Sequence, residues 1–311
     1  MEQALFRGAT LTIDNLIYHD AVRALTELLL RSDLAPCDLT VESLGMKGYP
    51  SSACILTREV GVAAGVAETT FLLESHGVDV MFRKNDGEAL EPGDALVEAV
   101  GPAGKLLAVE RVVLNLLQRM SGIATAVRSL QERVRKDGAE TKIVGTRKTP
   151  WGLLDKRALH LGNRGTHRLG LGDAIIIKNN HLALLAAREE EAAHQAIERA
   201  WRFRMDSAFI EVEVRTAEAA RAAARAFRRL QEEAGEEYPC LLLLDNMTPD
   251  GISGVLDMLR REGLWDHTLV EASGRISELN LEEYVASGVD AISIGALTHS
   301  TRALDMHQRI S

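Results

Sequence analysis

Hydrophobic and polar residues follow two different patterns along this chain, one before and one after about residue 142. In the first part, apolar residues at helical spacing predict a helix over residues 20–30. Short apolar runs at residues 54–56 and 79–82, between polar turns, predict strands. A longer apolar stripe predicts a helix over residues 104–136, interrupted at Ser121 and Gly122. We therefore expect an N-terminal α+β domain over residues 1–118 and a second domain over residues 119–311.

The second part alternates short apolar runs with helical patterns, which is typical of a parallel sheet with crossover helices. The predicted strands are residues 143–145, 174–177, 209–214, 241–244, 269–270 and 291–294. The predicted helices are residues 184–202, 217–233, 249–261, 279–286 and 301–310. Six strands are fewer than a closed barrel needs, so the pattern leaves two arrangements open: an incomplete barrel and an open doubly wound sheet.

Polar or glycine residues follow each of these strands. The successive strand ends carry Thr146-Arg147-Lys148, Lys178-Asn179-Asn180-His181, Asp245-Asn246, Glu271-Ala272-Ser273-Gly274 and Gly295-Ala296. In the third predicted strand, residues 209–214, Glu211 and Glu213 alternate and point to one face. Because the carboxyl ends of parallel strands meet at one edge, these residues are expected at a common mouth.

Composition and charge narrow the classes of function. The chain has 46% hydrophobic and 26% charged residues, which is typical of a globular protein. A net charge of −9 disfavours nucleic-acid binding, and no apolar run approaches the length of a membrane helix. The three cysteines are widely spaced and form no CxxC pair, which disfavours disulfides and thiolate zinc sites. We expect a protein of the reducing cytoplasm, with neither nucleic acid nor membrane as partner.

The positive charge is concentrated in residues 142–181. This window holds eight basic and two acidic residues, a net +6 in a chain of −9. Such a cluster predicts a binding site for a multiply charged anion. We interpret Lys156 and Arg157 as part of an exposed basic helix, and Arg147, Lys148 and Lys178 as site residues because they directly follow apolar strands.

Two further features specify the anion. Ser273-Gly274 and Gly295-Ala296 each lie between a strand and a predicted helix, where backbone N–H groups favour phosphate. Glu213 and Asp245 lie at neighbouring strand ends, and such carboxylates hold Mg²⁺ or a sugar diol. Together they suit a sugar phosphate that carries a metal-bound pyrophosphate.

Eight segments in this order resemble the quinolinate phosphoribosyltransferase family, also called carboxylating nicotinate-nucleotide pyrophosphorylases. They are ERVVLNLLQRMSGIAT (110–125), TRKT (146–149), HR (167–168), IKNNH (177–181), EVEV (211–214), LDN (244–246), EASG (271–274) and GALTHS (295–300). The resemblance implies an N-terminal α/β sandwich domain and an incomplete α/β barrel. It also implies a homodimer with shared active sites, assembly beyond a dimer being left open.

The implied enzyme joins quinolinate to the ribose of phosphoribosyl pyrophosphate in NAD biosynthesis. Pyrophosphate and CO₂ leave, and nicotinate mononucleotide remains. The resemblance places Lys148 near the reacting centre, gives Glu213 and Asp245 the ribose hydroxyls and Mg²⁺, and gives Ser273, Gly274, Gly295 and Ala296 the 5′-phosphate. The residues implied for the dicarboxylate and the pyrophosphate are Thr146, Arg147, His167, Arg168, Lys178 and, from the partner's chain, Arg111.

Several positions depart from the family pattern, among them Leu154, Asn163, Arg164 and Arg275. They leave open a related transferase with another aromatic acid as acceptor. A catalytically silent paralogue that binds phosphoribosyl ligands, and a barrel aldolase with Lys178 as Schiff base, are further alternatives.

Overall fold

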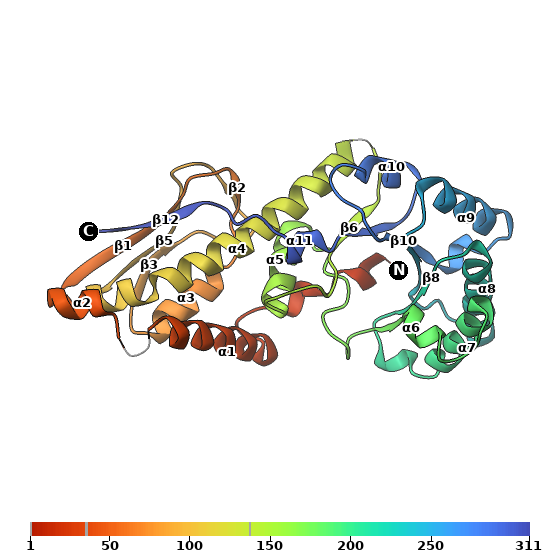
Figure 1. Cartoon of the computed structure of the whole chain (residues 1–311), viewed down its shortest axis with the longest axis horizontal. Helices are drawn as coiled ribbons and strands as arrows, with labels where there is room; N and C mark the ends of the chain where they lie inside the picture. The colour runs from red at the N-terminus through yellow and green to blue at the C-terminus, as the bar shows by residue number, and fades with distance from the viewer. Residues whose placement is uncertain (1, 35–36, 137) are drawn as a thin grey trace. The chain divides into compact units, whose positions relative to one another are not determined.

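The computed structural model describes residues 2–34, 37–136 and 138–311 and separates into two compact units (Figure 1). The barrel unit combines residues 2–7, Ser129–Arg147 and Gly165–Ala296. The sandwich unit combines Gly8–Arg128, Lys148–Arg164 and Leu297–Ser311. The single boundary after residue 118 stays a prediction.

The barrel unit contains a six-stranded parallel sheet in the order β6-β11-β10-β9-β8-β7. The strands are β6 (Lys142–Val144), β7 (Ile175–Ile177), β8 (Ile210–Val214), β9 (Cys240–Asp245), β10 (Leu269–Ser273) and β11 (Ala291–Ser293). From β7 to β11 each strand pairs with the next, and the last strand pairs with the first. This single direction of winding is that of a barrel, so the sheet is an incomplete barrel and not a doubly wound sheet, with the two edges at β6 and β7.

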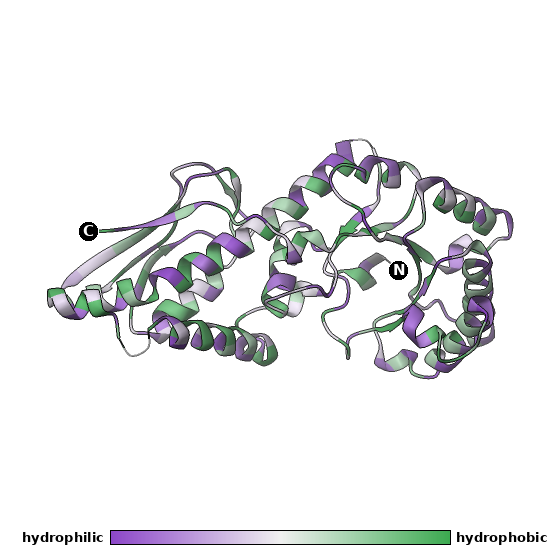
Figure 2. Cartoon of the chain, in the orientation of Figure 1, coloured by the Kyte–Doolittle hydropathy of each residue, from purple (hydrophilic) through white to green (hydrophobic). Residues whose placement is uncertain are grey.

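Helices follow most of these strands. They are α6 (Asn179–Leu182), α7 (Glu189–Trp201), η3 (Arg204–Asp206), α8 (Ala217–Ala234), α9 (Pro249–Arg261), η4 (Trp265–His267) and α10 (Leu281–Ala286). Thr216 and Thr248 cap α8 and α9, and Pro249 occupies the first turn of α9. The strands are largely hydrophobic, whereas α8 and α9 carry both hydrophilic and hydrophobic residues (Figure 2). The helices therefore lie with one face on the sheet and the other towards solvent.

The first residues of the chain close one end of the barrel. The short helix η1 (Glu2–Leu5) places Ala4 and Leu5 in a cluster with Phe209, Leu241 and Leu269, which lie at or near the beginnings of their strands. The amino end of the sheet is therefore filled by side chains. The carboxyl end is the one left for a ligand.

The sandwich unit has a four-stranded antiparallel sheet in the order β12-β1-β5-β3. Its strands are β1 (Pro50–Thr57), β3 (Asp79–Arg83), β5 (Ala95–Pro102) and β12 (Met306–Ile310), with the small pair β2 (Gly61–Val62) and β4 (Ala89–Leu90) beside it. Its helices are η2 (Gly8–Thr10), α1 (Leu16–Asp33), α2 (Leu39–Leu44), α3 (Val66–Ser75) and α5 (Leu153–Asn163). The helix α4 (Ala103–Lys136) contributes residues 103–128 to this unit, and α11 (Ala296–His299) contributes its last three.

Two predictions about local structure were wrong. The helix predicted over residues 301–310 is instead the strand β12, which pairs with β1 from Ala53 opposite Ile310 to Thr57 opposite Met306. Residues 104–136 are helical as predicted, but Ser121 and Gly122 do not interrupt α4. Ser121 Oγ bonds the backbone of Ala64, and a Cβ on Gly122 would lie 2.1 Å from the carbonyl oxygen of Arg302. These small residues allow close packing inside the unit. No helix of the described residues is long and apolar enough to cross a membrane.

Candidate functional site

The carboxyl ends of the barrel strands carry most of the predicted site residues. Thr146 and Arg147 follow β6, Lys178 follows β7, Glu213 lies on β8, and Asp245 ends β9. Ser273 ends β10, and Gly295 and Ala296 follow β11. The prediction that these residues share one edge of the sheet therefore agrees with the topology of this unit.

His167 and Arg168 enter the same unit from the segment that precedes β7. Both are buried, at 6% and 7% exposed, and His167 has a left-handed φ of 55°. The His167 N–H donates to the carbonyl oxygen of Leu5 at 2.9 Å, and the hydroxyl of Thr166 donates to the same oxygen at 3.3 Å. The N-terminal segment thus fixes the backbone at this pair.

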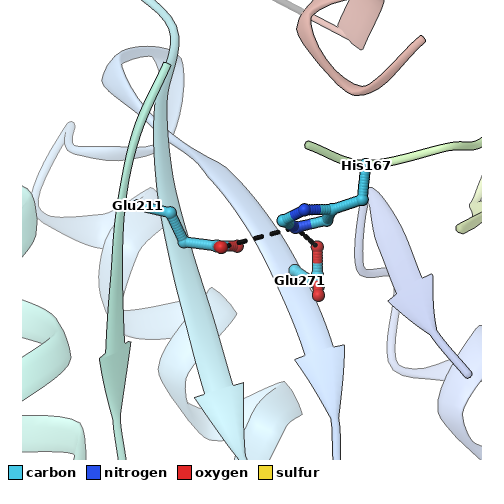
Figure 3. Close-up of side chains that lie close together, drawn as sticks. All are labelled: His167, Glu211 and Glu271. Carbon is cyan, nitrogen blue, oxygen red and sulfur yellow. Dashed lines mark ion pairs between the residues drawn. The ribbon is translucent and has the colours of Figure 1, made fainter. Parts of the chain in front are cut away.

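The His167 imidazole lies between two buried carboxylates (Figure 3). Its Nε2 is 3.1 Å from Glu271 Oε2 on β10 and 3.4 Å from Glu211 Oε2 on β8. Glu211 is fully buried and Glu271 is 1% exposed. We call these three residues the barrel cluster. Apart from the ion pairs with His167, no oxygen of either carboxylate has a hydrogen-bond partner among the described residues.

Burial and charge act in opposite directions on the ionisation of the barrel cluster. Burial lowers the pKa of His167, but the two carboxylates outweigh it and raise the pKa to about 9. Burial and the charge of Glu271 raise the pKa of Glu211 above its ordinary value. Meanwhile the backbone N–H of Arg168 donates to His167 Nδ1 at 2.9 Å, which requires a lone pair on that atom. In the form that accepts this bond the ring is neutral, against the direction of its raised pKa, and Nε2 carries the hydrogen that faces the carboxylates.

Arg168 is a buried cation that forms no ion pair with any described residue. One guanidinium nitrogen donates to the carbonyl oxygen of Ala174 at 3.0 Å. Burial and the nearby charge of Arg147 lower the pKa of Arg168. This guanidinium has further N–H donors beyond the one that bonds Ala174, and Arg147 adds positive charge nearby. It is therefore suited to bind an anion.

Glu213 and Asp245 are engaged by neighbours that the sequence did not point to. Asn179 Nδ2 donates to Glu213 Oε1 at 2.6 Å. Arg215 Nε lies 3.1 Å from Asp245 Oδ2. Both carboxylates are partly exposed and present hard oxygen atoms, so their chemistry fits Mg²⁺ or ribose hydroxyls.

The loop after β10 is shaped by a close approach of two loops. Gly274 has a φ of 99°, and a Cβ there would lie 2.5 Å from Asn246 Oδ1, so only glycine fits. Ser293 Oγ donates to Ser273 Oγ at 2.9 Å, which joins the ends of β10 and β11. Arg275 follows with a left-handed φ of 55°, is exposed, and forms no ion pair with any described residue.

Two predicted site residues, Arg111 and Lys148, belong to the sandwich unit. Arg111 is exposed on α4, and Lys148 is exposed with its carbonyl oxygen held by the hydroxyl of Thr298 at 2.8 Å. The interpretation of Lys156 as part of an exposed basic helix was wrong, because α5 buries Lys156 to 1% exposure. Leu154, on the same helix, is equally buried and is therefore a packing residue.

Sequence reasoning gave no role to two members of the barrel cluster. The alternation of Glu211 with Glu213 predicted that they share a face. Glu271 was seen only as a strand-end residue, whereas it lies inside β10 and contacts His167 from 104 positions away in the chain. The available signal was the presence of glutamates within otherwise apolar strands.

Comparisons with known proteins agree with this architecture. Residues 123–309 match the family model described as quinolinate phosphoribosyl transferase, C-terminal domain, and residues 38–121 match the N-terminal domain of the same family. A probable carboxylating nicotinate-nucleotide pyrophosphorylase of Methanothermobacter thermautotrophicus is 37% identical over 284 residues, 91% of this chain and 96% of the relative. The human carboxylating nicotinate-nucleotide pyrophosphorylase is 33% identical over 289 residues, 92% of this chain and 91% of the relative.

A solved structure shows the same likeness in three dimensions. The nicotinate-nucleotide pyrophosphorylase of Francisella tularensis superposes with a TM-score of 0.80 at 25% identity. The match covers 94% of this chain and 96% of that one.

Proposed function

The chain belongs to the quinolinate phosphoribosyltransferase family, and from that premise we propose how its barrel unit and its strand-end residues carry out the reaction. The protein is an enzyme of NAD biosynthesis. It transfers the phosphoribosyl group of phosphoribosyl pyrophosphate to the ring nitrogen of quinolinate, with release of pyrophosphate and CO₂.

One observation carries the assignment of the anion site: Arg168 is buried without an ion-pair partner among the described residues. A buried guanidinium normally has a carboxylate or phosphate partner. Quinolinate brings two carboxylates, so Arg168, Arg147 and Lys178 supply the matching charges. His167 supports Arg168 through its Nδ1, which accepts a hydrogen bond from the backbone N–H of Arg168.

The phosphoribosyl donor occupies the loops after the last strands. Ser273, Gly274, Gly295 and Ala296 offer a hydroxyl and backbone N–H groups to the 5′-phosphate. Gly274 supports this role, because a glycine has no side chain to separate the loop backbone from a ligand. Glu213 and Asp245 hold the ribose hydroxyls.

Mg²⁺ would be held by Glu213 and Asp245 together with the pyrophosphate oxygens. When bound, the ion neutralises charge on the leaving pyrophosphate. Arg215, whose Nε lies 3.1 Å from Asp245 Oδ2, would add a positive charge beside the pyrophosphate.

The chemistry at the reacting carbons follows from charge. As the anomeric bond breaks, the ribose gains oxocarbenium character, which the carboxylate of Glu213 stabilises. Loss of the carboxylate next to the ring nitrogen leaves an electron pair on that carbon, and a proton replaces CO₂. We place Lys148 at this reacting centre, where an ammonium group stabilises the developing negative charge.

We further propose a homodimer in which Arg111 of each chain completes the partner's site, as its exposure on α4 permits. A cytoplasmic location agrees with the three free cysteines. The exposed Lys178 lacks the burial that activates Schiff-base lysines, which disfavours an aldolase.

The test is an assay with phosphoribosyl pyrophosphate and Mg²⁺, in which CO₂ release from quinolinate and nucleotide formation from nicotinate are compared. We expect turnover with quinolinate and none with nicotinate. In Lys148→Ala, kcat should fall by at least about 100-fold. Lys47→Ala removes an exposed lysine paired with Glu42 and serves as the control. Full activity of Lys148→Ala would remove Lys148 from the reacting centre, and turnover of nicotinate alone would replace the acceptor.

A further inference from the structure

The barrel cluster buries more negative charge than its single imidazole can satisfy. Glu211 and Glu271 come from strands separated by β9, and both point into the barrel interior (Figure 3). Their carboxylates lie 3.1 and 3.4 Å from His167 Nε2, and none of their four oxygens accepts a hydrogen bond from a described residue. Burial of such groups costs folding free energy. A pair of leucines would fill the same space more favourably, so stability does not explain these glutamates.

A metal ion does not explain them either. The distances of 3.1 and 3.4 Å from His167 Nε2 to the two carboxylates suit the edges of a metal coordination shell. However, a histidine ligand must offer a lone pair on the atom that faces the metal. The N–H of Arg168 already uses the Nδ1 lone pair, so the hydrogen lies on Nε2, where the metal would have to bind.

A chain of contacts connects the barrel cluster to the anion site. Glu271 and Glu211 both lie at ion-pair distance from His167 Nε2, and His167 Nδ1 accepts a hydrogen bond from the backbone N–H of Arg168. The ring of Phe209 stands edge-on to the imidazole at 5.3 Å between centroids and restricts its rotation further. Each step is buried, so the imidazole has one orientation. The backbone that carries Arg168 is then fixed as well.

We propose that Glu271 and Glu211 are positioning residues for substrate binding: they orient His167, and His167 holds the buried Arg168 in place for a carboxylate of the substrate. This inference rests on the proposed function, because it assigns Arg168 to the dicarboxylate. Of the two glutamates, Glu271 has the larger effect on the orientation of His167, because it lies closer to Nε2. The specificity of the enzyme for an acidic acceptor then depends on glutamates that do not touch it.

The test uses two substitutions of Glu271 in the full-length enzyme. Glu271→Gln keeps an oxygen that accepts from Nε2–H. Glu271→Leu keeps the volume but removes the acceptor. We expect Glu271→Leu to raise the KM for quinolinate about tenfold or more while the KM for phosphoribosyl pyrophosphate stays within about twofold. Glu271→Gln should restore the KM for quinolinate to within about threefold of the natural enzyme.

Thermal unfolding distinguishes a positioning role from a purely structural one, because the two roles predict different changes in Tm. We expect the Tm of Glu271→Leu to equal or exceed that of the natural enzyme, because a buried carboxylate has been removed. Glu218→Gln, on the exposed side of α8, controls for the loss of a glutamate. If Glu271→Leu does not fold, the same comparison is made between Glu211→Leu, which removes the other carboxylate, and Glu211→Gln, which keeps an acceptor oxygen, and an unchanged quinolinate KM in Glu211→Leu would overturn the proposal.

Three other outcomes would overturn it as well. They are an unchanged KM for quinolinate in Glu271→Leu, an equal rise in both KM values together with a lower Tm, and stoichiometric Zn²⁺ binding that Glu271→Gln abolishes. Failure of the proposed function is recognised separately, because the natural enzyme would then not turn over quinolinate at all.

Discussion

Each unit of the molecule buries a pair of carboxylates around one basic side chain, but the two arrangements are satisfied to different degrees. In the sandwich unit, Glu68 and Asp86 lie beside Arg157, with Tyr18 as a fourth member; we call this the sandwich cluster. In the barrel unit, Glu211 and Glu271 lie beside His167 alone. Charge and burial are similar in the two clusters, so the difference lies in the remaining hydrogen bonds.

The sandwich cluster gives its carboxylates neutral donors. The Tyr18 hydroxyl donates to Glu68 Oε1 at 2.6 Å, and Asp86 accepts the first N–H groups of α3 at 2.9 and 3.4 Å. Asp86 thus caps a helix from a distant loop, and Arg157 on α5 lies 3.7 Å from it. These bonds join α1, α3 and α5, so the cluster supports the architecture of its unit.

No described residue gives the barrel cluster such additional donors, and the cluster lies below the carboxyl ends of the strands. The comparison teaches that burial of charge does not by itself mark a functional site. A buried group whose bonds are left incomplete, next to a cation without an ion pair among the described residues, is the better indicator.

The largest difference between the two clusters is expected when the cation of the sandwich cluster is removed. Arg157→Leu leaves two buried carboxylates without their counter-charge, and we expect a loss of about 3 kcal/mol in the free energy of unfolding. Both KM values should stay unchanged, in contrast with Glu271→Leu. Urea denaturation and steady-state kinetics measure the two effects. Arg58→Leu, which removes an exposed pair with Asp305, should cost less than about 1 kcal/mol. A shifted quinolinate KM in Arg157→Leu would make the two clusters alike.

The pH dependence of stability offers a second, smaller contrast. Burial and the charge of Asp86 raise the pKa of Glu68 to about 7. Between the ordinary value near 4.3 and about 7, the folded state therefore binds more protons than the unfolded state. The free energy of unfolding should fall as pH rises through this window, by up to about 3 kcal/mol.

Glu68→Gln carries a neutral side chain at every pH and should flatten the slope between pH 4.5 and 7. Denaturation curves collected across this range measure it. Glu74→Gln, in the same helix but outside the sandwich cluster, should keep the slope of the natural protein. An identical slope in Glu68→Gln would mean that Glu68 is not the group that titrates.

The barrel was predictable because its strands are short apolar runs that each end in a polar segment. All six predicted strands are present, and so are the helices α7, α8, α9 and α10. The C-terminal segment was not predictable from its own pattern, since its few large apolar residues, Leu304, Met306 and Ile310, are too sparse to define a period. Its pairing with β1, about 250 residues away in the chain, decides in favour of the strand. Gly122 was misread for a similar reason, because the backbone that requires its small size belongs to residue 302.

The positions of the proposed site residues along the strands were predictable one by one, but their contacts were not. The sequence places Arg168, Lys178, Glu213 and Asp245 at strand ends or in recognisable motifs. It does not show that Asn179 bonds Glu213 or that Arg215 pairs with Asp245, because these partners depend on side-chain geometry between adjacent strands. The link from Glu271 to His167 is also out of reach, since it crosses the interior of the barrel.

The smallest expected effects come from one strained arginine in each unit, and they sharpen the comparison between structure and site. Arg164 ends α5 with a φ of 75°, and Arg275 follows Gly274 with a φ of 55°. A left-handed backbone costs a non-glycine residue about 1 kcal/mol, so Arg164→Gly and Arg275→Gly should each stabilise the protein by up to about that amount. Only Arg275 lies in the proposed phosphate loop. Its substitution alone should therefore raise the KM for phosphoribosyl pyrophosphate, by about threefold, and Arg275→Lys should restore it in part because an ammonium keeps the charge. Thermal unfolding and initial rates at varied donor concentration measure both effects. If Arg275→Gly stabilises the protein and leaves the KM for phosphoribosyl pyrophosphate unchanged, then Arg275, like Arg164, has no role at the site.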